Sequence, residues 1–507
     1  MRPRDGALLL ALFSSGLTGC ATSAIDSAPE RPDRPWKPAT TGFGEILPGK
    51  PGEQPAYGGY VLPANGVAAT LPFAPSELNA EHAYSLSELV DIAQSNNPLT
   101  RTAWNNARVA ALASGVVRSA YLPNVTGSFV AGYRNGDSSI SGLGPDADNH
   151  VTSHGTITAL SLLWLLFDFG ERDAVLEASR EDGAIASIAF TGAHQHVIHA
   201  VCLAFYAHAA LRARVVSTEK SLQNVEVIRS AAEDRYAQGV GTVIEAAQAR
   251  QAAAQARLLH VKAVGAAEDA YVTLIAATGI SPLTRIGVAD VSGRTLPSAD
   301  DHVARVVEAA LARRPDVLEA YAARKAGLAR IRAAQAESLP KLVFAATGSY
   351  ATGSFDLGVI PVLGHAPALN VSGNRLGITL LGGVSMPVFD GGRRLALLAQ
   401  ARAQADTAEA RLARVKNEAI REVIFAENTL RTTLAAHDAS RELVAAAQTT
   451  YDATLEAFKT GVGSVTEVML AQDHLLLAHD AETDAYYASL SAAATLALST
   501  GVLGAAP

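Results

Sequence analysis

The sequence predicts a mainly α-helical protein with a membrane β-barrel, built from one unit of helix, strand, strand, long helix and helix that occurs twice. Three observations lead to this fold class: an internal repeat, two alternating strands in each copy, and two long helical stretches without proline. Four strands cannot close a barrel, and an open sheet edge cannot stay in lipid. We therefore expect several chains to share one barrel, with eight strands from two chains or twelve from three.

The internal repeat appears as matching segments at a nearly constant spacing. Leu122-Pro123 matches Leu339-Pro340, which lies 217 positions later. Phe167-Asp168 matches Phe389-Asp390, which lies 222 positions later. A net insertion of five residues between Leu339-Pro340 and Phe389-Asp390 explains the change in spacing from 217 to 222. Two matching copies in the same order indicate a duplicated structural unit.

The spacing divides the chain into a first copy over 81–280, a linker over 281–297 and a second copy over 298–507. Each copy opens with an Ala-rich helix that ends at a Leu-Pro pair. Two runs of alternating apolar residues follow, typical of membrane-barrel strands of about nine to eleven residues. The expected apolar faces are Val125, Gly127, Phe129, Ala131 and Tyr133 in copy one, and Leu342, Phe344, Ala346, Gly348, Tyr350, Leu376, Ile378, Leu380, Gly382, Val384, Met386 and Val388 in copy two.

A long helix is expected after the second strand of each copy, over 170–238 and 392–460. At 1.5 Å per residue, each stretch would be roughly 100 Å long. Helices of this length do not fit a compact globule, so they must form a coiled coil or a helical tube. A shorter helix returns after a Gly-Val-Gly turn in both copies.

The N-terminus predicts secretion and lipidation. Residues 1–19 combine Arg2 and Arg4 with a short apolar run, which is typical of a signal peptide. The run ends in Leu17-Thr18-Gly19-Cys20, which resembles a bacterial lipobox, and we expect Cys20 to carry the lipid. Ala21 follows Cys20, the pattern of an outer-membrane lipoprotein.

Residues 20–80 are expected to form a tail, because ten prolines and many glycines leave little to build a core. The segment 44–50 fits G-x-x-x-x-G-K, but Pro51 stands where a Mg²⁺-binding Ser or Thr would follow. We therefore expect no nucleotide site there.

Composition and motifs argue against most other functions. The formal net charge of −8 argues against nucleic-acid binding, and two cysteines cannot build a disulfide scaffold. Cys202 lies in an apolar helical stretch and is expected to be a buried hydrophobe. We find no hydrolase, zinc or dinucleotide motif, so we expect no enzyme activity, no cofactor and no metal.

Together these features resemble the TolC family, and specifically its lipidated outer-membrane efflux proteins. The resemblance covers 81–507 and includes the FDxGxR sequence after the second strand, Arg314-Pro315-Asp316-Val317, and the Gly-Val-Gly turns. It implies a trimer with one twelve-stranded β-barrel in the outer membrane and a long α-helical barrel across the periplasm.

The two Gly-Val-Gly turns carry most of the functional interest. By the resemblance, they form the periplasmic tip, where an adaptor docks and the tube narrows. The expected tip and adaptor-contact residues are Tyr236, Gly239, Gly241, Phe458, Gly461 and Gly463. Glu245 and Glu467 each fit the last position of a capping box, and the resemblance also places them near the pore constriction. Capping and pore lining are both open, although Leu470 stands where some relatives have a second acidic residue.

Other polar and aromatic residues have simpler expected roles. Asp168 and Asp390 precede the long helices and are predicted N-caps. His194, His196 and His199 are expected on a solvated helix face rather than at a metal. The patch Trp164, Leu165, Leu166, Phe167 and Phe169 ends a strand and predicts interface packing or an aromatic belt.

The function implied by the resemblance is a passive outer-membrane exit duct of a tripartite efflux pump. The implied partners are a periplasmic adaptor, an inner-membrane pump, further copies of this chain and outer-membrane lipid. The alternative within the same class is the exit duct of a type I protein secretion system. A periplasmic adaptor itself is less consistent with the sequence, because it should have one helical hairpin rather than two.

Overall fold

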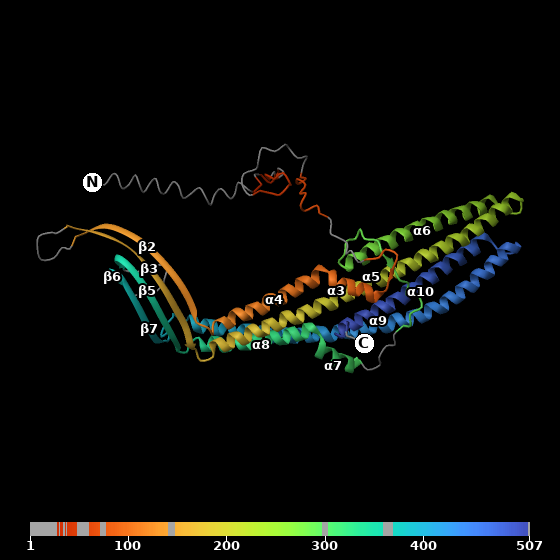
Figure 1. Cartoon of the computed structure of the whole chain (residues 1–507). Coiled ribbons are helices and arrows are strands. Elements are labelled where there is room, and N and C mark those ends of the chain that lie inside the picture. Colours follow the sequence, from red (N-terminus) through yellow and green to blue (C-terminus); the bar gives the residue numbers. More distant parts are fainter. Residues whose placement is uncertain are drawn as a thin grey trace. The chain divides into compact units, whose positions relative to one another are not determined.

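The computed structural model describes residues 28–29, 31–33, 36, 38–47, 60–70, 78–139, 148–296, 303–357 and 369–504 (Figure 1). The chain divides into two units, Met1–Leu78 and Asn79–Pro507. Cys20 and the expected signal peptide lie outside the described residues. In the first unit, Thr40 and Ile46 form an isolated bridge around a turn at Gly44, which has a φ of 85°.

The second unit contains the helices and the sheet. In chain order they are β1 (Ala83–Tyr84), α3 (Leu86–Asn96), α4 (Pro98–Ser119), β2 (Asn124–Ser139), β3 (Asp148–Phe167), α5 (Glu171–Ala237), α6 (Val243–Ala277), β4 (Gly287–Val288), α7 (Val303–Arg313), α8 (Pro315–Ala336), β5 (Lys341–Leu357), β6 (Leu369–Ser372), β7 (Arg375–Ser385), α9 (Arg393–Thr460) and α10 (Val465–Ser499). The predicted order of helix, strand, strand, long helix and helix is confirmed in both copies.

The long helices have nearly the predicted bounds, because nothing in either stretch breaks a helix. α5 has 67 residues and α9 has 68, and each folds back into a 35-residue helix, α6 or α10. α8 lies between α5 and α9, and α5 also packs against α10. Small residues allow these close approaches: a Cβ added to Gly327 would lie 3.2 Å from the Cα of Ala405. Part of α5 is long and apolar enough to cross a membrane by length and composition, but it belongs to this helical assembly.

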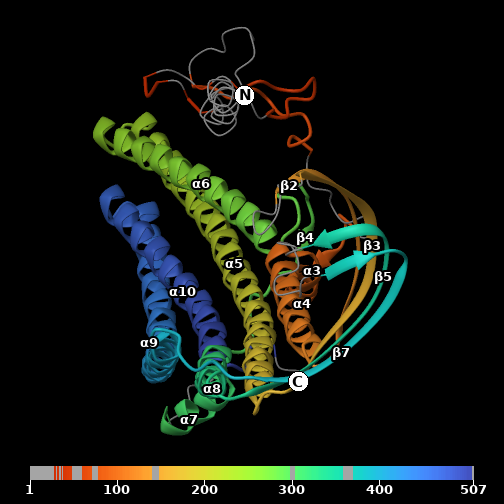
Figure 2. The ribbon, with the colours of Figure 1, turned by 90° about the vertical axis from the view of Figure 1, so that its left-hand side faces the viewer.

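The strands form one curved antiparallel sheet in the order β2, β3, β5, β7 (Figure 2). β6 pairs with Ser354–Leu357 of β5, next to the part of β5 that pairs with β7. β6 and β7 are therefore one strand interrupted near Gly373, whose φ is 91°. With 16, 20 and 17 residues, β2, β3 and β5 are longer than expected, because their pairing continues without a break beyond the apolar stretch.

Cross-strand register places the predicted apolar positions on one face of the sheet. Val125 lies opposite Leu162, Leu162 opposite Ala346, and Ala346 opposite Leu380. Directly opposed residues in an antiparallel pair point to the same side, so this row is a single apolar line across four strands. The neighbouring positions form a row of hydroxyls on the other face, from Thr126 to Ser161, Thr347 and Thr379.

Apolar side chains on this face are largely uncovered. Eight large hydrophobic side chains there have relative exposures of 55 to 75%: Val125, Phe129, Tyr133, Leu160, Leu376, Ile378, Leu380 and Val384. Water does not favour so large an apolar patch, whereas a bilayer does. At the sheet edges, β2 pairs only with β3 and β7 only with β5 among the described residues.

The junction from sheet to helix corrects one sequence prediction. The N-cap residues are Gly170 and Gly392, at φ of 88° and 89°, rather than Asp168 and Asp390. Each aspartate lies two residues earlier, because the chain first turns through two left-handed residues. Asp168 still accepts the backbone N–H of Arg172 at 3.0 Å and its Nε at 2.8 Å. Phe169 has a φ of 54° where the second copy has Gly391, so the first junction is the strained one.

In both copies, the residue just before α4 or α8 binds the C-terminal end of the returning helix, α6 or α10. Asn97 donates from Nδ2 to the Ala277 carbonyl at 3.1 Å, and Arg314 donates from Nη1 to the Ser499 carbonyl at 3.0 Å. Each side chain thereby satisfies one orphan carbonyl at the end of a helix. Asn97 and Arg314 occupy equivalent positions of the repeat, and both residues are buried.

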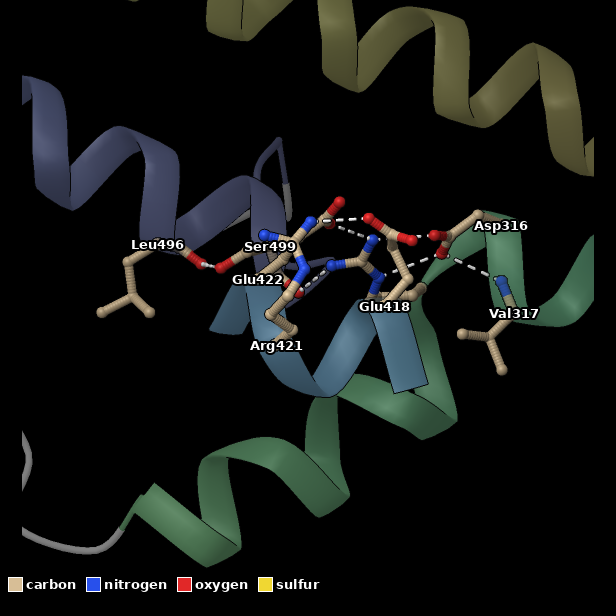
Figure 3. Close-up of polar contacts among 8 residues, drawn as sticks. Asp316, Val317, Glu418, Arg421, Glu422, Leu496 and Ser499 are labelled. Carbon is tan, nitrogen blue, oxygen red and sulfur yellow. Dashed lines mark hydrogen bonds and ion pairs between the residues drawn. The ribbon is translucent and has the colours of Figure 1, made fainter. Parts of the chain in front are cut away.

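Arg314 also ties α8 to α9, which Asn97 cannot do. Its Nη2 donates to Asp316 at 2.7 Å and to Glu422 at 2.6 Å (Figure 3). Glu418 and Arg421 form a separate pair beside it, at 2.5 Å. Charge-assisted bonds to a buried guanidinium are stronger than neutral ones, so this cluster fixes the start of α8 against α9 and α10.

Candidate functional site at the helical hairpin tips

The first hairpin turn depends on two glycines. α5 ends at Ala237, and Gly239 follows with a φ of 77°, the left-handed conformation expected of a helix stop. The N–H groups of Val240 and Gly241 then donate to the Arg235 carbonyl at 3.0 and 2.9 Å. A Cβ on Gly241 would lie 3.1 Å from the carbonyl carbon of Arg235 and from the amide nitrogen of Tyr236, so this close turn favours glycine.

The second turn repeats this geometry. Gly461 has a φ of 84°, and the N–H groups of Val462 and Gly463 both donate to the Ala457 carbonyl at 2.9 Å. A Cβ on Gly463 would lie 3.1 Å from the Ala457 side chain. At each turn, the first glycine therefore provides the left-handed backbone, and the second allows the chain to pass close to the end of the helix.

Both returning helices begin with the capping box that the sequence predicts. The Thr242 N–H donates to Glu245 Oε2 at 2.7 Å, and the Glu245 N–H donates to Thr242 Oγ1 at 3.1 Å. The corresponding distances between Ser464 and Glu467 are 3.0 and 3.2 Å. The hydrogen bond from the Thr242 backbone lowers the pKa of Glu245, because it stabilises the ionised carboxylate.

Arg235 joins the two tips, a contact that sequence reasoning missed. Its Nη1 donates to the Phe458 carbonyl at 3.0 Å, and its guanidinium lies 5.3 Å from the Phe458 ring centroid. A cation at the C-terminal end of α9 also interacts favourably with the helix dipole. No local pattern marks this pair, because the two residues lie 223 positions apart.

The two predicted tip aromatics have different surroundings. Phe458 is 2% exposed and belongs to a core cluster with Ile228 and Ala232 of α5 and Val468 of α10. Tyr236, at the equivalent position of the first copy, is 48% exposed. The structure therefore brings Phe458 into the contact between hairpins and leaves Tyr236 on the surface of one chain.

The tips present apolar side chains to solvent. Val240, Val243 and Ile244 are each more than 60% exposed at the first tip, and Val462 is 88% exposed at the second. These side chains lie beside the two capping glutamates. The combination of small turns, exposed aliphatic groups and carboxylates suits contact with another protein rather than chemistry.

The remaining candidate residues lie elsewhere on the molecule. His199 is half-buried, not solvated as expected, and its Nε2 lies 3.0 Å from Thr495 Oγ1 of α10. Burial lowers the pKa of His199. Trp164 donates from Nε1 to the Tyr121 carbonyl at 2.9 Å, and the Phe167 and Phe169 rings meet edge to face at the end of β3. Among the residues that the structure describes, no three His, Cys, Asp or Glu side chains are placed to bind a metal.

Comparison with known proteins supports the expected family. The family model described as "Outer membrane efflux protein" matches residues 89–280 and 306–502. The chain is 28% identical over 426 residues to protein CyaE of Bordetella pertussis, covering 82% of this chain and 85% of CyaE. It is 26% identical over 443 residues to the outer membrane efflux protein BepC of Brucella suis, covering 86% of this chain and 90% of BepC.

Solved structures support the fold. The outer membrane protein VceC of Vibrio cholerae superposes with a TM-score of 0.69 at 19% identity, covering 82% of this chain and 96% of VceC. CusC, whose structures describe transmembrane channel formation, superposes with a TM-score of 0.69 at 20% identity, covering 85% of this chain and 96% of CusC.

A glycine series tests whether the tips depend on left-handed backbone. We expect Gly239→Ala and Gly461→Ala to destabilise the protein by about 1 kcal/mol each, because an added Cβ disfavours a positive φ. Gly115→Ala is the matched control: Gly115 lies within α4 with open space at its Cβ position. It should stabilise the helix by up to about 1 kcal/mol. Thermal unfolding in detergent measures all three, and equal effects at the three positions would contradict the assignment.

Proposed function

The chain belongs to the outer membrane efflux protein family, and on this premise we propose that it is the outer-membrane exit duct of a tripartite efflux pump. Small molecules would pass through it passively from the pump and periplasm to the exterior. The observation that carries this proposal is the sheet of β2, β3, β5 and β7, with an exposed apolar face, a row of hydroxyls opposite and two edges that are unpaired among the residues the structure describes. These are the properties of one segment of a membrane barrel.

Closing that barrel requires other copies of the chain. β2 and β7 lie at opposite edges of an antiparallel sheet with an even number of strands, so β7 of one copy can pair antiparallel with β2 of the next. Three copies would give a barrel of about twelve strands, wide enough for a lumen. The row from Thr126 to Thr379 would then face that lumen, and the apolar row from Val125 to Leu380 would face lipid.

The helices would continue the duct away from the membrane. α5 and α9 begin directly after β3 and β7, and Figure 1 shows the hairpin tips at the opposite end of the second unit from the sheet. At 1.5 Å per residue each long helix spans roughly 100 Å, a length suited to crossing the periplasm. The exposed valines at the tips would then meet a periplasmic adaptor, and the adaptor would connect the duct to an inner-membrane pump.

This mechanism assigns no chemical step to the chain. The duct supplies a path, and the pump supplies both substrate and energy. Hydroxyls lining a barrel offer hydrogen bonds to passing solutes without binding one tightly. The tip is the natural place for control, because helices that converge there bring Glu245 and Glu467 of each copy close to one axis.

Gene deletion with complementation tests the proposed function. We expect deletion to raise cellular accumulation of a fluorescent small-molecule efflux substrate, and the full-length chain to restore export. Loss of a secreted protein from the medium, with unchanged small-molecule export, would instead indicate a protein secretion duct. Purified protein that forms no conducting channel in a planar bilayer would contradict both.

Charge at the tip can be separated from helix capping. Glu245→Gln combined with Glu467→Gln keeps the capping hydrogen bonds and removes the charge, whereas Ala at both positions removes both. We expect the Gln variant to lose cation selectivity in single-channel recordings without losing stability, because a ring of carboxylates attracts cations. The Ala variant should also lose about 1 kcal/mol or less per helix. Wild-type selectivity in the Gln variant would show that both glutamates serve only as helix caps.

The pH dependence of the Glu245 cap has a defined sign. Its pKa is lowered from the ordinary value of 4.5 by the Thr242 hydrogen bond, so the cap contributes its full stability above about pH 4.5. That contribution is lost as the pH falls through the lowered pKa. Glu245→Gln should remove this part of the acid dependence.

Lipidation of Cys20 has a direct assay. We propose that cleavage before Cys20 exposes it for acylation, which anchors the chain to the outer membrane, and we expect Cys20→Ser to abolish labelling by radioactive palmitate. Channel formation should persist in that variant, because the apolar strand face inserts independently. Cys202→Ser is the matched control, since that thiol is buried in α5 and should not affect labelling. Undiminished labelling of Cys20→Ser would exclude the anchor.

A further inference from the structure

A hollow of about 670 Å³ lies where α5 and α6 meet the linker that joins the two copies of the repeat. Much of its wall is apolar, and includes Val215 of α5, Val264 of α6 and Ile286 of the linker. The side chains in the wall that can form hydrogen bonds or ion pairs are His208, Arg212, Glu268, Tyr271 and Arg285. A mostly apolar hollow of this size with a few polar groups has the usual form of a small-molecule site.

The linker side of the hollow is held in place by the chain itself. Tyr271 Oη accepts from the Ile286 N–H at 2.7 Å and donates to the Ile286 carbonyl at 3.1 Å. The following residues form β4, which pairs with β1, and the Ala289 N–H donates to the Tyr84 carbonyl at 2.9 Å. The hollow is therefore preformed, so a ligand does not have to order the linker when it binds.

His208 is a buried imidazole in this wall with incomplete hydrogen bonding. It is 5% exposed, and its Nδ1 has no hydrogen-bond partner in the part of the chain that the structure describes. Burial, and after it the charge of Arg212, lower the pKa of His208 to about 4, so the ring is neutral at pH 7. A neutral imidazole has one N–H donor and one acceptor, and buried polar atoms are seldom left unpaired. A polar group in the hollow would supply a partner.

Arg212 brings a positive charge that no carboxylate neutralises at close range. Its Nη1 donates to the Val288 carbonyl at 3.4 Å, and it forms no ion pair with any residue that the structure describes. Asp290 lies near enough to sense its charge, but accepts hydrogen bonds from the Ser292 N–H at 2.9 Å and from Ser292 Oγ at 2.7 Å. A guanidinium has five N–H donors, so Arg212 can bind a carboxylate through two of them.

The other two charges of the hollow form an ion pair. Arg285 Nη1 lies 3.0 Å from Glu268 Oε2, and both side chains are more than 60% exposed. The Arg285 guanidinium also lies 5.1 Å from the Tyr271 ring centroid. The wall of the hollow therefore carries one positive charge in excess, that of Arg212, next to apolar side chains and a neutral imidazole. An anion with an apolar body complements this combination.

The second copy of the repeat shows that the fold does not require these polar groups. The spacing of 222 positions holds through both hairpins, since α6 and α10 each have 35 residues and begin at Val243 and Val465. The residues 222 positions after His208, Arg212, Glu268 and Tyr271 are Leu430, Leu434, Leu490 and Ala493. Leu430 is 2% exposed, so an apolar side chain fills the position of His208 in the equivalent helix.

The apolar wall positions change in the opposite sense. The residues 222 positions after Val215, Val216, Val264 and Ala267 are His437, Asp438, Tyr486 and Ser489. Two of these polar groups have clear partners within the chain: Tyr486 Oη donates to the Arg294 carbonyl at 2.9 Å, and Ser489 Oγ donates to the Ala485 carbonyl at 2.8 Å. In the first copy, by contrast, His208 and Arg212 keep hydrogen-bonding capacity that the chain does not use.

We propose that this hollow binds a small organic monocarboxylate with an apolar body. Its carboxylate would pair with Arg212 and accept a hydrogen bond from His208, and its body would lie against Val215, Val264 and Ile286. Arg212 follows the first residue of α5 by 41 positions, about 60 Å along the helix from the sheet, so the ligand is a water-soluble acid and not a lipid of the bilayer. One chain forms the whole site, so the inference goes beyond the proposed function and does not depend on it.

Equilibrium dialysis with 2-naphthoate tests the site, because this fluorescent acid joins one carboxylate to an apolar ring system. The uncharged 2-naphthamide, which has nearly the same shape, is the ligand control. The full-length chain is used in an uncharged detergent, with detergent alone as the blank. Arg212→Gln removes the charge, and His208→Leu copies the residue at the equivalent position of the second copy. Arg257→Gln is the matched control, because it removes one positive charge from an exposed side chain of α6 outside the hollow.

We expect one 2-naphthoate to bind per chain, and Arg257→Gln to bind it as the wild type does. Binding should weaken at least about tenfold for 2-naphthamide and in Arg212→Gln, because both lose a charge-assisted pair, and at least about threefold in His208→Leu. Thermal unfolding without ligand checks that each variant is folded, and the amide tests the charge without any substitution.

Equal affinity for the acid and the amide would overturn the site, as would equal affinity in Arg212→Gln and Arg257→Gln. Wild-type affinity in His208→Leu would remove the imidazole from the proposed contact. If the wild-type protein conducts ions in a planar bilayer but binds no 2-naphthoate, the site is wrong and the proposed duct stands.

Discussion

The structure depends on one constraint: backbone hydrogen-bonding groups cannot be left unpaired in lipid. The sheet of β2, β3, β5 and β7 has an apolar face fit for a bilayer, yet its outer edges find no partner in the described part of the chain. Each unpaired amide or carbonyl in hydrocarbon costs several kcal/mol, so one chain cannot insert alone. In the proposed shared barrel these edges would be paired, and the helices that follow β3 and β7 would form a ring.

The two copies of the duplicated unit are related in structure but differ in their side-chain contacts. Asn97 and Arg314 hold equivalent helix-end carbonyls, yet only Arg314 also binds two carboxylates. Phe169 adopts the left-handed conformation that Gly391 adopts more easily. These differences show that the two copies have kept the same backbone path while their side-chain contacts have diverged.

Periodicity and turn chemistry were enough to predict most of the fold. Alternation identified the apolar face from Val125 to Tyr133, because one face of a membrane strand must be apolar regardless of its neighbours. The helix stop at Gly461 and the cap at Ser464 were also predictable, since both depend on residues within one turn.

Contacts between distant segments were not predictable in this way. Arg235 and Phe458 meet only because α5 and α9 end near each other. The local sequence around each residue does not indicate this contact. The misplaced N-caps have a local cause, because Asp168 resembles a cap but two left-handed residues separate it from α5. His199 was expected in solvent because the face of α5 that α10 covers depends on tertiary packing.

The mass of the intact protein in mild detergent tests the shared barrel most directly. Native mass spectrometry of the full-length chain, extracted from outer membranes, reports how many copies remain together after lipid is stripped away. Three copies per particle are expected, since β2 and β7 edges then pair throughout. A stable, folded monomer would show that one chain satisfies its own sheet edges, and would contradict the account at its foundation.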